Sequence, residues 1–306
     1  MNAKQGAIPE NQDTKKIILK QNDLTEKIKN YITEIPSLPV SANKVLEICG
    51  NINVNPSDLN KVISLDPVLT GKILQLINSA YYGLGTHIKS LVRAITMLGL
   101  NTVKNLVLST AVLNILQKNK GKKGINIKGF WHHSLCVGVI SKLLAVKQGV
   151  DPKDYEEYFT AGLLHDIGKI PLNAVLASDY VRLVNKSDEE HKTLYETENE
   201  NLEINHCAAG GMIASAWKLD SSIIDVISYH HNACAYSGDN TAIVCNTAIA
   251  NYFSVVNEVG FAGDRKPVKP EKKVWDTAGI SEDIYPDVLD KLNNEIERAR
   301  IFLQIS

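Results

Sequence analysis

The sequence predicts an all-α protein, and three observations support that prediction. Apolar residues recur with the 3.6-residue period of a helix, and the alternating runs typical of strands are few. Helix start signals recur, as at 55–58 (Asn-Pro-Ser-Asp), where an N-cap residue, a proline and a first-turn acid follow one another. The composition, 44% hydrophobic and 22% charged over 306 residues, is that of a globular protein. We therefore expect a helical fold with one large core or two moderate ones.

The helix signals also divide the chain. Starts are expected at Asp66-Pro67 and Asp151-Pro152, and a stop at Gly168, which Pro171 follows. Two stretches rich in glycine, proline and lysine, 117–129 and 261–273, have the composition of linkers. We expect five segments: a polar tail (1–22), an N-terminal helical subdomain (23–117), a basic linker (118–128), a helical bundle (129–255), and a linker with a C-terminal helix at about 283–303 (256–306).

Charge and cysteine content exclude several classes of protein. The net charge of −1 gives no global cationic field for nucleic acid or an anionic membrane. The five cysteines form no CxxC pair, which argues against a disulfide framework or a thiolate zinc site and fits a reducing cytoplasm. We find no signal peptide, and polar residues interrupt the longest apolar stretches, such as 106–116, so no membrane span is expected.

Histidine is the informative residue type. Seven of the eight histidines fall between Trp131 and His231, and one of them starts the dipeptide His165-Asp166 in the sequence LLHDIGK. This dipeptide ends a predicted helix that begins at Pro152. An imidazole and a carboxylate on one helical turn can approach a single ion, or the carboxylate can bridge two.

The other histidines lie at the ends of further predicted helices. His133 opens one helix, His206 opens a second, and His230-His231 closes a third. A helical bundle can direct such side chains into one central cavity. This set, rich in imidazole and without thiolate, suits iron, manganese or zinc better than magnesium or calcium. An open coordination position on such an ion could activate water or bind a phosphate.

Each of these residues also has a purely structural interpretation. The histidines could cluster by accident, and His87, His132 and His191 are expected to be caps or half-buried polar residues. Lys169 could neutralise a bound phosphate, but lysine is also favoured near a helix C-terminus by the helix dipole. Free cysteine is usually a small core residue, so Cys136 and Cys207, although close to His133 and His206, are left out of the metal set.

The order of His133, His165-Asp166, His206 and His230-His231 resembles the HD superfamily of metal-dependent phosphohydrolases, in particular its HD-GYP relatives, in which such positions bind iron. Three upstream segments, 35–51, 64–83 and 91–109, resemble the HDOD (HD-related output domain) family. The resemblance includes the Leu-Pro start, the Asp-Pro-x-Leu stretch at 66–69, the Asn78-Ser79 pair and the 94–99 helix, and it covers about residues 30–255.

The resemblance implies a bacterial signalling module, usually an output or partner domain, with no established general enzymatic activity. HDOD proteins often lack several metal ligands, whereas this chain keeps almost all of them. It departs from the catalytic relatives in two ways: the helix after the His pair offers only Asn251 or Asn246 where an acidic ligand is expected, and 230–240 contains no Gly-Tyr-Pro signature. Because an amide oxygen is neutral, we expect that one ion of a multinuclear site binds more weakly, or that the site holds only a single ion.

Two functions follow as expectations. The first is a cytoplasmic signal-transduction module that acts through contacts with signalling proteins, with a pocket that is structural or binds a metal or a small ligand such as a nucleotide or phosphate. The second is a metal-dependent phosphohydrolase or phosphodiesterase acting on a nucleotide. Asp166 and Lys169 would then be catalytic, with Lys169 stabilising charge on the phosphate. A nucleic-acid regulator is supported only by the lysines of 118–128, and the sequence does not encode the oligomeric state.

Overall fold

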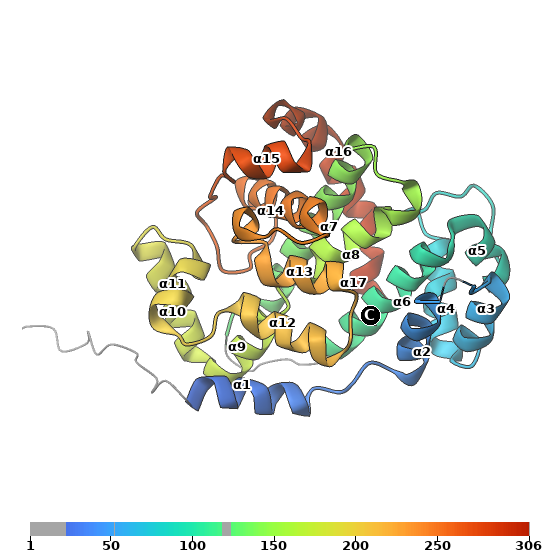
Figure 1. The fold of residues 1–306 in the computed structure, drawn as a ribbon, viewed down its shortest axis with the longest axis horizontal. Coiled ribbons are helices and arrows are strands. Elements are labelled where there is room, and N and C mark those ends of the chain that lie inside the picture. Colours follow the sequence, from blue (N-terminus) through green and yellow to red (C-terminus); the bar gives the residue numbers. More distant parts are fainter. Residues whose placement is uncertain (1–22, 52, 118–123, 306) are drawn as a thin grey trace, which may run out of the picture.

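The computed structural model describes residues 23–51, 53–117 and 124–305, and within these ranges every regular element is a helix (Figure 1). The all-α prediction is therefore confirmed. The polar tail predicted for 1–22 and most lysines of the predicted basic linker, those at 118–123, lie outside the described residues. Lys128, by contrast, lies in the first turn of a helix.

The N-terminal helices follow the local signals closely. Asn55 accepts hydrogen bonds from the backbone of Ser57 and Asp58 in a capping box, and Asp66 caps the next helix through the amide of Leu69. The elements are α1 (Asp23–Glu34), α2 (Val40–Cys49), α3 (Pro56–Ile63), α4 (Pro67–Ile77), α5 (Leu91–Leu98) and α6 (Leu100–Leu116). Helices α2 to α5 gather around one side of α6, whereas α1 lies apart from them, against α9 and α12 (Figure 1).

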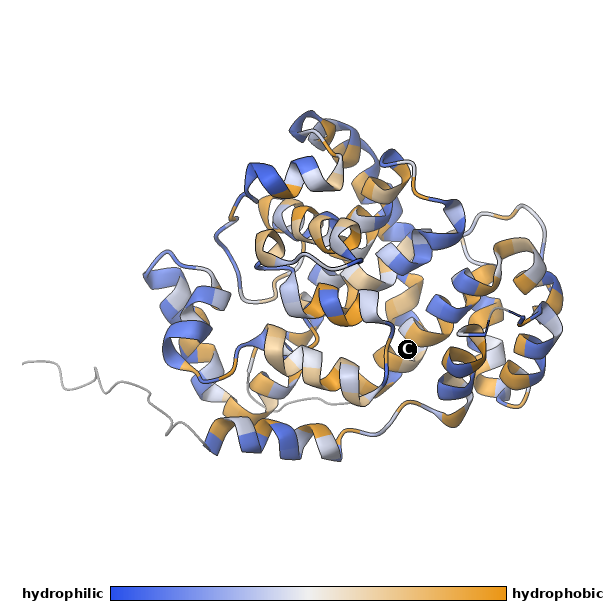
Figure 2. Cartoon of the chain, viewed as in Figure 1, coloured by the Kyte–Doolittle hydropathy of each residue, from blue (hydrophilic) through white to orange (hydrophobic). Residues whose placement is uncertain are grey.

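The second group of helices surrounds α7, which packs most closely on α8. A methyl group on Gly162 would lie 2.8 Å from the Cα of Gly138, so both positions need glycine for the two backbones to approach. The elements are α7 (Ile127–Lys147), η1 (Pro152–Asp154), α8 (Tyr155–Leu164), α9 (Lys169–Leu176), α10 (Ser178–Glu189), α11 (Leu194–Asn201), α12 (His206–Ala216), α13 (Ser221–Tyr229), η2 (Ala233–Ala235) and α14 (Thr241–Val256). Apolar residues concentrate in α7 and α14, and polar residues in the outer helices α10 and α11 (Figure 2).

The C-terminal elements pack back onto this bundle. They are α15 (Lys272–Ala278), η3 (Glu282–Ile284), α16 (Tyr285–Ala299) and α17 (Ile301–Gln304). Helix α16 lies along α7, and the ring of Phe302 stands 4.7 Å from that of Phe159 and 5.1 Å from that of Tyr81. The C-terminal region therefore completes the core where the two groups of helices meet.

Three expected helix boundaries were wrong. Helix α7 begins at Ile127, capped by Asn126, so His133 lies in its second turn instead of opening it. The stop expected at Gly168 comes four residues earlier, because α8 ends at Leu164, and a new helix, α9, starts directly after Gly168 with Pro171 in its first turn, where no intrahelical amide bond is lost. The single C-terminal helix is interrupted at Arg300, and α15 lies in a region that was expected to be largely linker.

One described helix, α7, is long and apolar enough to cross a membrane, with a mean hydropathy of 1.2. The bent pair α5 and α6 would pass the same test only if a break of 115° were ignored. In α7, 72% of the apolar stretch is buried inside the protein, which is the behaviour of a core helix.

Candidate metal centre

The six predicted ligands come from four helix ends that meet in the bundle. His133 lies in α7, His165 and Asp166 follow α8, His206 is the first residue of α12, and His230 and His231 follow α13. Asn205 fixes the start of α12 by accepting a hydrogen bond from the Ala208 amide. The structure brings all six side chains together.

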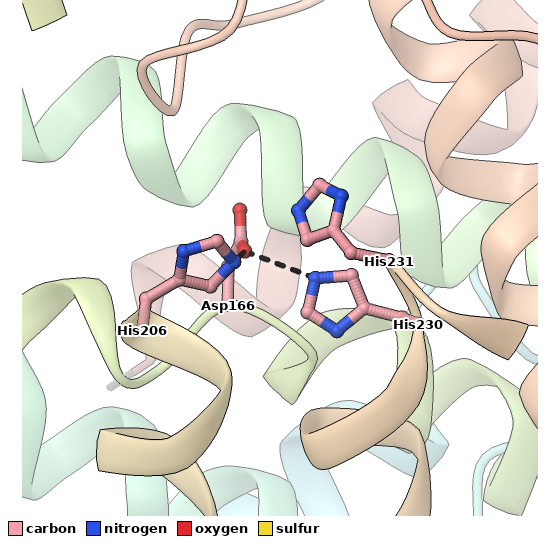
Figure 3. A group of neighbouring side chains, drawn as sticks. All are labelled: Asp166, His206, His230 and His231. Carbon is pink, nitrogen blue, oxygen red and sulfur yellow. Dashed lines mark ion pairs between the residues drawn. The ribbon is translucent and has the colours of Figure 1, made fainter. Parts of the chain in front are cut away.

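Asp166 is the centre of the cluster. Its carboxylate is 1% exposed, and its two oxygens face different imidazoles. Oδ1 lies 3.3 Å from Nε2 of His206 and 3.5 Å from Nε2 of His230 (Figure 3). Oδ2 lies 3.3 Å from Nε2 of His165 and 3.8 Å from Nε2 of His133. One carboxylate therefore lies between two groups of imidazole nitrogens.

The opposite nitrogen, Nδ1, of four rings is held by the protein. His165 contacts the carbonyl of Gly162 at 2.7 Å, and His230 contacts the carbonyl of Val226 at 3.1 Å. His206 contacts Glu198 Oε2 at 2.6 Å, and His133 contacts the hydroxyl of Ser254 at 3.1 Å. Carbonyl and carboxylate oxygens can only accept, so the Nδ1 atoms of His165, His206 and His230 donate and their Nε2 atoms keep a free lone pair.

Those Nε2 atoms are buried without a hydrogen-bond partner. The same holds for Oδ1 of Asp166, so the unpartnered atoms are Nε2 of His165, His206, His230 and His231 and this carboxylate oxygen. Buried polar atoms without partners destabilise a fold, and several in one place require an explanation. A bound cation would satisfy all of them, so the residues present fit a metal.

The potential ligand atoms form two sets that share Asp166. One set comprises Asp166, His206, His230 and His231, and the other comprises His133, His165 and Asp166. Within each set the ligand atoms lie within 4.8 Å of one another. Imidazole and carboxylate ligands are those of iron, manganese and zinc sites.

Lys169 lies inside the cluster and is held by two carboxylates. The side chain is 1% exposed, and Nζ lies 2.8 Å from Oδ2 of Asp166 and 3.2 Å from Oδ2 of Asp264. Burial alone would lower the pKa of Lys169, but these two carboxylates outweigh it and raise the pKa above its usual value. Lys169 is therefore a fixed positive charge beside the candidate ligands, and its predicted contact with phosphate stays a prediction.

The imidazoles differ in their affinity for protons. Burial lowers the pKa of His133 to about 3, and the neighbouring His165 adds to the effect. Burial acts in the same direction on His206, but the Glu198 carboxylate outweighs it and holds the pKa of His206 well above its usual value. The site thus contains imidazoles that prefer to be neutral, such as His133, and others that are stabilised as cations when no metal is bound, such as His206.

The two asparagines considered for the missing acidic position are now distinguished. Asn246 donates to Gln148 Oε1 at 2.7 Å and to the carbonyl of Ser141 at 3.3 Å. Asn251 instead lines a cavity of about 160 Å³ together with His230 and His231, whereas the Oδ1 atoms of both asparagines are buried without a partner. Of the two, Asn251 is the residue beside the metal centre.

Sequence reasoning missed Asp264, Glu198 and Ser254. Asp264 lies in a stretch that was interpreted as a linker, yet its carboxylate accepts from the Leu194 amide at 2.7 Å and pairs with Lys169. Glu198 lies in a highly acidic, outwardly polar helix, and nothing local marks it as buried. Asp264 and Ser254 are far along the chain from the residues that they contact, and Glu198 lies in a helix whose composition predicts exposure.

The remaining histidines and cysteines lie outside the ligand sets. His132 is half-buried, as expected, whereas His87 and His191 are exposed. Cys207 lies behind a ligand, with its sulfur 3.9 Å from Nδ1 of His230, on the side of the ring that faces away from Asp166. Neither Cys207 nor Cys136 belongs to a potential ligand set among the described residues.

Comparison with known proteins places these features in a family. The HDOD domain family model matches residues 35–233. A protein of uncharacterised function from Treponema pallidum is 25% identical over 228 residues, which are 74% of this chain and 44% of the relative, so the chain spans less than half of that protein.

Solved structures give the same family and fold. An HDOD domain protein of unknown function from Geobacter sulfurreducens is 26% identical, with a TM-score of 0.72 and coverage of 91% of this chain and 96% of that one. A protein from Shewanella amazonensis, provisionally named a metal-dependent phosphohydrolase, is 18% identical, with a TM-score of 0.59 and coverage of 90% and 96%. A protein from Marinobacter aquaeolei, provisionally named a signal transduction protein, is 18% identical, with a TM-score of 0.69 and coverage of 96% and 68%.

Proposed function

The chain belongs to the HDOD family of the HD superfamily, and from that premise we propose that it is a regulatory module that binds a transition metal in its histidine cluster and acts through contacts with signalling proteins. One observation carries the metal-binding part: four Nε2 atoms and one carboxylate oxygen are buried without partners around Asp166. Iron is the first candidate and manganese and zinc are the alternatives, because imidazole serves all three.

Different residues would supply the ligand atoms of such a centre and hold them in position. Asp166 supplies oxygens to both ligand sets, and the backbone carbonyls and Glu198 orient the rings so that the Nε2 lone pairs converge. A bound ion would supply Lewis acidity beside the 160 Å³ cavity. The five free thiols are consistent with the cytoplasm that we propose as the place of action.

The cavity supports a second candidate, a metal-dependent phosphohydrolase or phosphodiesterase acting on a nucleotide. It opens beside His230 and His231, and its wall carries Lys266 and Lys269 together with the acidic Asp264 and Glu271. Space and positive charge next to a metal centre are what a phosphate ester requires. The Shewanella amazonensis protein carries a matching provisional name, and its 18% identity establishes the shared fold alone.

Metal content per chain tests the first proposal. Protein purified without chelator or nickel affinity resin is expected to carry about one or two transition ions, measured by inductively coupled plasma mass spectrometry. His165→Ala and Asp166→Ala are expected to lose metal because each removes a ligand atom. His87→Ala, at an exposed position outside both ligand sets, is the control and should keep the wild-type content. Wild-type protein without metal, with both ligand variants folded, would refute metal binding.

Turnover tests the second candidate. Metal-loaded protein is incubated with nucleotide and generic phosphodiester substrates, and release of product is followed with wild type and Asp166→Ala. Hydrolysis that disappears in the variant favours the enzyme. Absence of turnover with iron, manganese and zinc leaves the regulatory module as the function.

A further inference from the structure

The two ligand sets around Asp166 differ in the number of ligands that they offer. The Oδ1 set has three imidazoles, from His206, His230 and His231, in addition to the shared carboxylate. The Oδ2 set has two, from His133 and His165. Each additional neutral imidazole donates a lone pair to the ion, so the Oδ1 set alone offers the four protein ligands of a complete tetrahedral site.

The groups behind the imidazoles differ as well. In the Oδ1 set, the fully buried Glu198 accepts from Nδ1 of His206 at 2.6 Å and from its backbone amide at 2.9 Å. The other oxygen of Glu198 accepts from the hydroxyl of Tyr180 at 2.6 Å. A carboxylate behind a ligating histidine fixes the ring and makes its free nitrogen a stronger donor to metal.

The Oδ2 set has only neutral groups in the equivalent place. Nδ1 of His133 faces the hydroxyl of Ser254 at 3.1 Å, and Nδ1 of His165 faces the carbonyl of Gly162 at 2.7 Å. These partners orient the rings without adding negative charge. The imidazoles on this side are therefore the weaker donors.

A cation already occupies the Oδ2 side. The ammonium of Lys169 lies 2.8 Å from Oδ2 of Asp166, whereas Oδ1 has no hydrogen-bond partner. Asp264, reaching in from the segment after α14, contacts the same ammonium at 3.2 Å and holds it in place. A second metal ion bound at Oδ2 would meet this fixed positive charge at short range in a buried setting, where charges are poorly screened.

We propose that the cluster contains two metal positions of unequal affinity. The tight position is at Oδ1 of Asp166, and Glu198 raises its affinity through the hydrogen bond to His206. The weak position is at Oδ2, where the ammonium of Lys169, held by Asp264, repels a second cation. This inference rests on the proposed metal binding. It assigns Glu198 as a positioning residue and Lys169 as the group that keeps the second position weak. The resting protein holds one ion.

Two matched pairs of variants test the inequality, with Mn²⁺ as the probe. Binding is measured by titration calorimetry, and the number and coupling of bound ions by electron paramagnetic resonance. His206→Ala is expected to abolish the first binding event, while His133→Ala leaves its Kd within about twofold of wild type. Glu198→Gln is expected to weaken the first ion by about 10- to 100-fold, the effect typical of such outer partners, while Ser254→Ala behind His133 leaves it unchanged.

Lys169→Gln tests this repulsion. It is expected to add a second tight ion, with the spectrum of a coupled Mn²⁺ pair at two equivalents, whereas wild type shows an uncoupled signal at one equivalent. Circular dichroism checks that each variant folds. If Lys169→Gln or Glu198→Gln does not fold, the His133 and His206 pair decides the question.

The outcomes separate this inference from the proposed function. Equal weakening of the first ion by His133→Ala and His206→Ala, or two equally tight ions in wild type, would overturn the inequality and leave metal binding intact. Absence of Mn²⁺ binding to the wild-type protein would refute both.

Discussion

The N-terminal helices α2 to α5 and the bundle of α7 to α14 both bury apolar residues, but they differ in the polar residues that they bury. The buried residues of α2 to α5 are all apolar, for example Leu59, Ile73 and Ile95. The bundle also buries Asp166, Lys169 and four histidines, and hydrophobic burial alone cannot stabilise these polar groups. The comparison teaches that the first region is stabilised by apolar burial alone, whereas the second contains a buried polar cluster whose unpartnered atoms a metal ion could satisfy.

The largest expected effect on folding lies in the apolar region. Ile73 is fully buried, and Ile73→Ala should lower the free energy of unfolding by about 2–5 kcal/mol through lost burial and the cavity left behind. Metal content of the folded fraction should not change. Denaturant unfolding and metal analysis check both statements, and Ile73→Val, expected to cost about 0.5–1.5 kcal/mol, is the graded control. Loss of metal in folded Ile73→Ala would break the separation of the two regions.

A glycine beside the metal centre should couple stability to metal binding. A methyl group on Gly168 would lie 1.8 Å from the backbone oxygen of His206 and 2.4 Å from the amide of Gly210, so α9 and α12 would have to move apart. Gly168→Ala should cost about 1–3 kcal/mol of unfolding free energy and displace His206, with loss of metal.

The matched control for that change is Gly71→Ala in α4. No atom lies within 4 Å of the added methyl group, so this variant should be neutral or stabilising by about 0.5–1 kcal/mol, with unchanged metal. Thermal unfolding and metal analysis of both proteins make the comparison. Full metal retention in Gly168→Ala would contradict the close contact.

A smaller effect is expected from the cap of α3. Asn55 accepts from the amides of Ser57 and Asp58, at 2.9 and 3.2 Å, and Asn55→Ala removes both bonds. The unfolding free energy should fall by about 1 kcal/mol, with no change in metal content. Asn55→Ser, which restores an acceptor, should recover most of the loss in denaturant unfolding. A variant as stable as wild type would show that the cap contributes nothing.

The smallest effect concerns the charge of Asp66. The Leu69 amide is the main cause that holds the pKa of Asp66 below its usual value, and the hydroxyl of Ser41 adds to it. A carboxyl group whose pKa is lower in the folded than in the unfolded state stabilises the fold above pH 3.8, and this contribution disappears as pH falls through the folded pKa. Asp66→Asn, which keeps a capping oxygen, should cost less than about 1 kcal/mol at pH 7.

The pH dependence provides the check on that prediction. The difference in unfolding free energy between wild type and Asp66→Asn should shrink below pH 3.8 and vanish at lower pH. A difference that stayed constant down to the acid limit of folding would mean that the carboxylate charge has no part in it. Urea unfolding across this range measures the difference.

Local signals predicted the capped helices well, because a cap at Asn55 or Asp66 depends on residues three positions away. The clustering of the six candidate ligands was also predictable, since their order along the chain resembles a known family. Glu198 and Asp264 were not predictable. Their roles depend on contacts across 8 and 95 residues, with His206 and Lys169 respectively, and no periodicity encodes such contacts. Pro171 favoured an end of the helical region, but proline is tolerated within the first turn of a helix, and α9 contains it there.

The sharing of Asp166 between two ligand sets has an evolutionary consequence. A substitution at His133 removes a ligand from one set and leaves the other set intact. Further substitutions in the first set can then accumulate while the second set keeps its ligands. A substitution at Asp166 removes an oxygen from both positions at once and leaves Lys169 buried with a single partner, Asp264. If the cluster binds metal as proposed, descendants of this chain can therefore lose the second position by gradual steps, whereas loss of the aspartate removes an oxygen from both positions in a single step.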